Sequence, residues 1–218
     1  IAWLFNLRGS DVSYNPVFLA HALVDMQAAT LFVAEGKVPA DVATRLHSDG
    51  VAVRDYAQAA AALAALPASA VLLLDPRRVT LGLRESAPAA VKVVEAINPS
   101  VLLKSRKGAA EAAHVRTAME QDGAAMCEFY AWFEAAQGRE RITELTIDER
   151  LTAERAKRPG FVGLSFNTIA GFNANGAMPH YRATAASHAV IEGDGLLLID
   201  SGGQYLGGTT DITRVWPI

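Results

Sequence analysis

The stretch LLLIDSGGQYLGGTTDITRVW, residues 196–216, places two aspartates in an apolar, glycine-rich run. The side chains of a strand alternate between its two faces, so Asp200 shares a face with Leu198, and Asp211 shares a face of a following strand with Thr213. A reversal of the chain around Tyr205 and Leu206, helped by the glycines on either side, would make these strands antiparallel neighbours. The sequence therefore predicts two aspartates that face each other across adjacent strands.

Two facing carboxylates need something positive between them. Directly opposed residues have Cβ atoms about 5 Å apart, and like charges at that separation destabilise a sheet. A shared proton would relieve the repulsion, and so would pairing with Arg214, although Arg214 points to the face opposite Asp211 on a regular strand. One or two divalent ions bridged by the carboxylates are the better solution, because hard oxygen ligands suit manganese, zinc or cobalt. Two aspartates in solvated turns remain an alternative on spacing alone.

Composition limits the classes of function. The chain has 218 residues, of which 51% are hydrophobic and 20% charged, as in an ordinary globular protein with one large domain or two modest ones. Its net charge of -3 gives no electrostatic reason to expect a nucleic acid or membrane partner. Cys127 is the single cysteine, which excludes an internal disulfide and favours a reducing compartment such as the cytoplasm.

Strand and helix patterns alternate in the first hundred residues, which favours an α/β domain. The expected strands cover residues 2–7, 18–24 and 28–34, together with a buried strand at 71–75, and the expected helices cover residues 39–50 and 57–66. The basic residues Lys104, Arg106 and Lys107 then mark an exposed linker, with a phosphate-binding patch as the alternative.

A different pattern follows this linker. Apolar residues at helical spacing predict a long helix over residues 109–136, and a capping-box pattern at Thr146 predicts the start of a second helix that ends before Pro159. Strand-forming residues dominate from Phe161 onward. The apolar run at Ile1 also leads us to expect that the chain is an internal piece of a longer polypeptide.

The sequence resembles a known family in several ordered segments. LIDSGGQYLGGTTDITR, residues 198–214, resembles the LIDxGxxYxGxxxDxTR segment of metallopeptidases with the pita-bread fold. WLFNLRGSDVSYNPVF, residues 3–18, resembles the three-domain Xaa-Pro aminopeptidases (aminopeptidase P) within that group. The segments at 111–134 and 142–151 fit the same family. The resemblance implies a creatinase-like α/β domain over residues 1–103, incomplete at its start, and the first half of a pita-bread catalytic domain over residues 104–218.

The resemblance also implies roles for four residues. Asp200 and Asp211 match the first two ligands of a dinuclear metal centre, with Asp211 bridging the ions. His180 matches the catalytic histidine that hydrogen-bonds the substrate and stabilises the reacting carbonyl, and Phe166 matches a residue that lines the substrate pocket. The family completes its centre with a histidine and two glutamates further along the chain, so we expect the 218-residue piece alone to be inactive.

The activity implied for the intact protein is release of the N-terminal residue from peptides with proline in second position. The implied cofactors are two divalent metal ions, manganese first, with zinc or cobalt as alternatives. The family also implies a homodimer. Together with the single cysteine and the net charge of -3, this leads us to expect a cytoplasmic homodimer without nucleic acid or membrane partners. Two other readings stay open: a prolidase- or creatinase-like hydrolase on the same scaffold, and a non-catalytic pita-bread protein that binds peptides or proteins.

Overall fold

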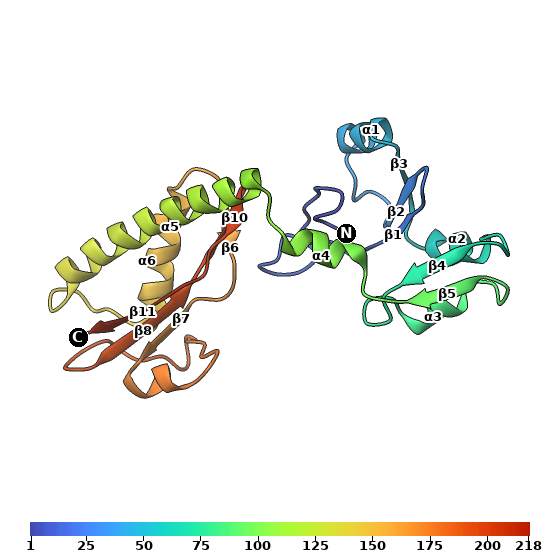
Figure 1. Ribbon diagram of the computed structural model, residues 1–218. Coiled ribbons are helices and arrows are strands. Elements are labelled where there is room, and N and C mark those ends of the chain that lie inside the picture. The colour runs from blue at the N-terminus through green and yellow to red at the C-terminus, as the bar shows by residue number, and fades with distance from the viewer. The chain divides into compact units, whose positions relative to one another are not determined.

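The computed structural model describes residues 1–218, and the chain divides into two units (Figure 1). The first unit comprises residues 1–11 and 17–106, and the second comprises residues 12–16 and 107–218. No helix combines the length and the apolar composition needed to cross a membrane. The sequence-based domain boundary between residues 103 and 104 stays a prediction.

A three-stranded sheet in the order β1-β2-β3 forms the first part of unit 1. Strands β1 (Ala20–Val24) and β2 (Ala29–Val33) lie within the ranges predicted for strands and are antiparallel. The carboxylate of Asp25 accepts hydrogen bonds from two backbone amides in the turn between them. Helix α1 (Ala40–Ser48) then connects β2 to the parallel strand β3 (Val51–Asp55). This alternation confirms the predicted α/β class.

The rest of unit 1 continues the alternation of helices and strands. Its elements are α2 (Gln58–Ala64), β4 (Val71–Leu74), α3 (Leu81–Glu85), β5 (Lys92–Glu95) and α4 (Pro99–Ser105). Strands β4 and β5 pair in parallel. Each strand is followed by a helix, which is the local pattern expected of βαβ units.

Two local predictions in unit 1 were wrong. Residues 2–7 form turns rather than a strand, with the amide of Leu7 donating to the carbonyl of Ala2 at 2.9 Å. In β4, Val71 is 64% exposed, so this strand is not buried. The expected linker at Lys104, Arg106 and Lys107 is exposed, and the division between the units falls between residues 106 and 107. The residues that lead into it form α4, because the Asn98 side chain caps this helix and a proline occupies its first turn.

Unit 2 packs two helices on one face of a sheet (Figure 1). Helix α5 (Ala109–Ala136) has the predicted bounds, and the sheet has the order β11-β8-β7, from β7 (Ile169–Phe172), β8 (Leu196–Ser201) and β11 (Ile212–Pro217). A second sheet, β10-β9-β6, contains β6 (Phe161–Leu164), β9 (Gly203–Tyr205) and β10 (Gly208–Thr209). Together with the helices, these strands confirm the predicted α+β character of this part.

Helix α6 (Glu144–Ala156) begins three residues before the predicted start, for which Thr146 was the expected N-cap. Its N-cap is Thr143, whose Oγ1 accepts a hydrogen bond from the amide of Thr146 at 3.2 Å. The hydroxyl of Thr146 in turn accepts a hydrogen bond from the amide of Thr143 at 3.3 Å. The capping box therefore exists, but Thr146 is its third helical residue rather than its cap.

The core of unit 2 determines which face of β8 is open. Leu197 and Ile199 are fully buried and pack in one cluster with Phe129 of α5 and Leu151 of α6. Because side chains alternate along a strand, Asp200 points to the face of the sheet opposite the helices.

Candidate metal and substrate site

Asp200 and Asp211 lie at one end of two adjacent antiparallel strands. In the register of β8 and β11, Asp200 pairs with Thr213, and Asp211 directly precedes β11. Ile212 is buried, whereas Asp211 and Thr213 are exposed, so these two share the face that carries Asp200. The two aspartates are therefore diagonal neighbours, not directly opposed. Diagonal neighbours lie about 7–8 Å apart, and this separation leaves room for ions between them.

Thr213 orients the carboxylate of Asp200. Its Oγ1 donates a hydrogen bond to Oδ1 of Asp200 at 2.8 Å. This bond engages one carboxylate oxygen and leaves the other for a ligand. The role of Thr213 could not be predicted from the sequence, because it depends on the strand register that places Thr213 opposite Asp200.

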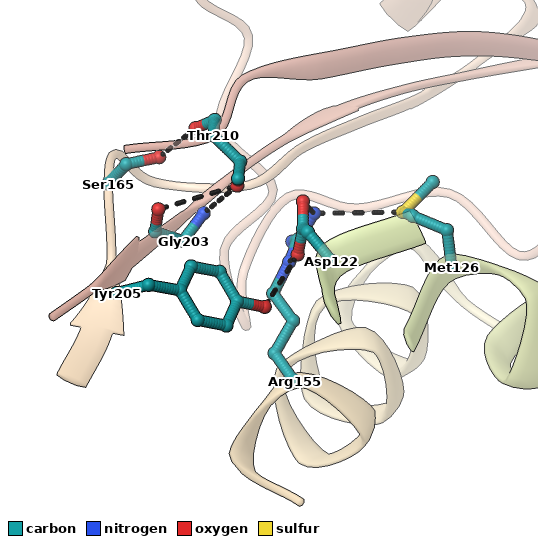
Figure 2. Close-up of polar contacts among 7 residues, drawn as sticks. All are labelled: Asp122, Met126, Arg155, Ser165, Gly203, Tyr205 and Thr210. Atoms are coloured by element: carbon teal, nitrogen blue, oxygen red, sulfur yellow. Dashed lines mark hydrogen bonds and ion pairs between the residues drawn. The ribbon is translucent and has the colours of Figure 1, made fainter. Parts of the chain in front are cut away.

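The backbone just before Asp211 is held by Thr210, which is buried (Figure 2). The amide of Gly203 donates to Thr210 Oγ1 at 2.8 Å, and the amide of Thr210 donates back to the carbonyl of Gly203 at 2.9 Å. The hydroxyl of Ser165 donates to the carbonyl of Thr210 at 2.9 Å. These bonds fix the position from which the Asp211 side chain projects.

Gly202 makes this close approach of backbones feasible. A Cβ atom at this position would overlap the carbonyl oxygen of Thr210 and the hydroxyl of Ser165. The glycine that follows Asp200 and Ser201 in the motif is therefore required by packing against the segment that leads to Asp211.

A buried ion pair between α5 and α6 also binds a side chain of β9 (Figure 2). Arg155 of α6 donates from Nε and Nη2 to the two carboxylate oxygens of Asp122 of α5, at 2.6 and 3.1 Å. The hydroxyl of Tyr205 of β9 donates to the same carboxylate at 2.9 Å. Burial, together with the charge of Asp122, raises the pKa of Tyr205, so its hydroxyl remains a donor. Tyr205 therefore anchors β9 to Asp122 and makes no hydrogen bond to Asp200 or Asp211.

Phe166 and His180 lie on loops of unit 2. Phe166 is half-buried in the turn between β6 and β7, three residues before Ile169, which pairs with Asp200. His180 is exposed in the segment after the 3-10 helix η1 (Asn173–Ala177), and its φ is 58°. Neither residue contacts an aspartate through a hydrogen bond. Their roles toward a substrate therefore stay predictions.

Glu144 is a second residue that the sequence did not reveal, and it is fully buried beneath the segment that contains His180. Its carboxylate accepts hydrogen bonds from the amides of Phe172 and Ala189 at 2.8 and 2.7 Å, and from the side chains of Asn175 and Tyr181 at 3.0 and 2.7 Å. Burial opposes ionisation, but the four donors lower the pKa of Glu144 overall. No local pattern marks this residue, because its partners are 28 to 45 positions away.

Asp200 and Asp211 fit part of a divalent metal centre. Two carboxylates on one face supply the hard oxygen donors that such ions prefer. No cluster of three or more histidine, cysteine, aspartate or glutamate side chains with metal-binding geometry occurs in residues 1–218. The assignment of Asp200 and Asp211 as metal ligands therefore stays a prediction.

Comparisons with known proteins follow the same division of the chain. Residues 1–111 match the creatinase/prolidase N-terminal domain, and residues 113–218 match metallopeptidase family M24. The probable Xaa-Pro aminopeptidase P of Botryotinia fuckeliana is 37% identical over 223 residues, covering 98% of this chain and 34% of that protein. Xaa-Pro aminopeptidase 1 of Dictyostelium discoideum is 38% identical over 219 residues, covering 98% of this chain and 34% of that protein.

A solved structure is similar over both units. The X-prolyl aminopeptidase from Caenorhabditis elegans, described as a cytosolic enzyme with a di-nuclear active site, matches with a TM-score of 0.89 and 26% identity. The match covers 99% of this chain and 36% of that one, so the chain spans about a third of the length of these relatives. The predicted fold and family resemblance are confirmed: the chain belongs to the creatinase/prolidase N-terminal domain family and carries, after that domain, a segment of metallopeptidase family M24.

Proposed function

We propose that the full-length protein is a metal-dependent aminopeptidase that releases the N-terminal residue from peptides with proline in second position. The observation that carries this proposal is the placement of Asp200 and Asp211 on one open sheet face, at the end of β8 and the start of β11. The similarity to Xaa-Pro aminopeptidases over nearly the whole chain supports the substrate class.

Asp200 and Asp211 would hold two divalent ions together with the histidine and two glutamates that the family has further along the chain, with Asp211 as the bridging residue. We propose manganese, with zinc or cobalt as alternatives, because carboxylate oxygens suit these ions. When bound, the ions act as Lewis acids toward the carbonyl of the scissile bond. Thr213 would orient Asp200 within this centre, and Thr210 would fix the backbone that carries Asp211.

His180 and Phe166 would act on the substrate. An imidazole N–H of His180 would donate a hydrogen bond to the reacting carbonyl, and this bond would strengthen as negative charge develops on the oxygen. Phe166 would form an apolar wall of the substrate pocket beside β7. The bond that would be cut is the tertiary amide before proline, whose ring nitrogen carries no N–H. Recognition of the proline would therefore depend on its shape and on apolar contact.

We further propose that the protein is a cytoplasmic homodimer. Its two domains would be divided between residues 103 and 104. The description of the Caenorhabditis elegans relative as cytosolic supports the compartment. The net charge of -3 gives no electrostatic reason to propose a nucleic acid or a membrane as a partner.

A panel of peptides tests the proposed function. The full-length protein, supplied with Mn²⁺, should release the first residue from an Xaa-Pro-Yaa tripeptide and leave the Xaa-Ala-Yaa analogue intact. Cleavage of the Xaa-Pro dipeptide alone would instead identify a prolidase. Binding of the proline peptides with no product under any metal would favour the non-catalytic alternative and contradict the proposal.

A further inference from the structure

The segment that carries His180 is clamped at both ends by Glu144. At one end, the Glu144 carboxylate binds the amide of Phe172 and the side chain of Asn175. At the other end, it accepts from the amide of Ala189, while the backbone amide of Glu144 donates to the carbonyl of Ala189 at 3.1 Å. One buried side chain therefore determines where a long loop leaves and rejoins the body of unit 2.

His180 itself occupies a tight turn. The amide of Tyr181 donates to the carbonyl of Met178 at 3.1 Å, which closes a four-residue turn with Pro179 and His180 at its centre. Proline in the second position and a positive φ, here 58° at His180, in the third are the features of a type II turn. A histidine in this conformation persists only where the surrounding structure holds it.

Tyr181 connects that turn to Glu144. As the last residue of the turn, it donates its hydroxyl to Glu144 Oε2 at 2.7 Å, and it also accepts a hydrogen bond from Asn175 at 3.0 Å. Burial and the bond to Glu144 raise the pKa of Tyr181 to about 12, so the phenol keeps its proton at neutral pH. A hydrogen bond from a phenol to an ionised carboxylate is stronger than one between neutral groups.

We propose that Glu144 is a positioning residue, which acts through the Tyr181 hydroxyl to hold the Met178–Tyr181 turn and thereby aim the imidazole of His180 at the substrate. This inference rests on the proposed function for the target of His180, but the clamp itself is a property of this chain. Displacement of a reacting group by about 1 Å can lower a rate about a hundredfold, so a modest shift of the turn would be visible in catalysis.

The test uses Tyr181→Phe in the full-length protein, because it removes one hydroxyl and leaves the buried carboxylate with its other donors. Tyr130→Phe is the matched control, since the Tyr130 hydroxyl is buried without a hydrogen-bond partner. We expect Tyr181→Phe to lower kcat for an Xaa-Pro tripeptide about ten- to a hundredfold with unchanged metal content, and Tyr130→Phe to leave kcat within about twofold.

A double-mutant cycle separates positioning from general destabilisation. If Tyr181 acts through His180, Tyr181→Phe should cause little further loss of kcat in a His180→Ala background. The same fractional loss in both backgrounds would overturn the proposal, because the hydroxyl would then act independently of the imidazole.

A second measurement keeps the inference testable if the proposed function fails. Should the wild-type protein not cleave proline peptides, the NMR signal of the His180 imidazole reports the clamp directly. Tyr181→Phe should shift that signal and leave the signal of His114, on α5, unchanged. An unchanged His180 signal would contradict the inference, whereas absent turnover with a shifted signal would contradict only the proposed function.

Discussion

Thr213 and Asp200 face each other across β8 and β11, and the threonine Oγ1 donates to the aspartate Oδ1 at 2.8 Å. A hydroxyl in this position restricts the carboxylate to one orientation before any metal binds. Residues that orient metal ligands in this way commonly contribute about ten- to a hundredfold to metal affinity.

Thr213→Val should therefore weaken metal binding by the full-length protein. The substitution keeps a β-branched side chain in the strand but removes the donor to Asp200, so we expect the Kd for Mn²⁺ to rise about tenfold. Isothermal titration with Mn²⁺ measures the change. Thr44→Val, at an exposed position of α1, serves as the control and should leave the Kd unaltered. Equal Kd values for the Thr213 variant and the wild type would remove Thr213 from the site.

Gly202→Ala should destabilise the second unit. The added methyl group would overlap the carbonyl oxygen of Thr210, so the backbone before Asp211 would have to move, at a cost of about 1–3 kcal/mol. Gly123→Ala, on helix α5, is the contrasting control, because the added methyl group would have no neighbouring atom within 4 Å. The unfolding free energy of Gly123→Ala should rise by about 0.5–1 kcal/mol. Denaturant unfolding compares the two, and a neutral Gly202→Ala would show that the close approach is not needed.

The buried pair of Asp122 and Arg155 should be far more sensitive than an exposed pair. Asp122→Ala leaves a fully buried guanidinium without its carboxylate and should cost about 3–5 kcal/mol of unfolding free energy. Glu95→Ala breaks the exposed pair with Arg84 and should cost less than about 1 kcal/mol. Similar losses in the two variants, measured by denaturant unfolding, would contradict this account of how α5 and α6 are joined.

Glu144 should make stability depend on pH in the acidic range. Burial opposes its ionisation, but its four hydrogen-bond donors lower its folded-state pKa below the ordinary value of 4.5. Its contribution is therefore complete above the unfolded pKa and is lost as the pH falls through the folded pKa. The difference in unfolding free energy between wild type and Glu144→Gln should be constant near neutral pH and should shrink below about pH 4.5. A difference that does not change with pH would show that the charge of Glu144 contributes nothing.

Local patterns predicted the elements that depend on periodicity. Helix α5 has the predicted bounds because apolar residues recur along it and Gly138, with a φ of 68°, follows its end. The prediction of a strand at residues 2–7 was wrong, because apolar side chains can reach a core from a turn as well as from a strand. Phe5 and Leu7 do pack against the core cluster of the first sheet.

The site required tertiary information. Alternation along the strands was sufficient to place Asp200 and Asp211 on one face, but not to determine their offset. That offset arises because the chain reverses at Leu206 and Gly207, one position later than the predicted reversal around Tyr205 and Leu206. Tyr205 pairs with Gly208, and the same register continues to the pair of Asp200 and Thr213. Glu144 could not be predicted for a related reason, because all four of its hydrogen-bond donors come from residues distant in sequence.

Metal content of the full-length protein tests most directly whether Asp200 and Asp211 hold the ions. Asp211→Asn keeps the size of the side chain and removes the charge of the proposed bridging ligand, while Asp194→Asn makes the same change at an exposed position between strands. After saturation with Mn²⁺ and removal of excess, we expect about two ions per chain in the wild type and in Asp194→Asn, the number in a paired-metal site. In Asp211→Asn both ions should be lost or nearly so. Wild-type metal content in Asp211→Asn would contradict the assignment of these two aspartates to the metal centre.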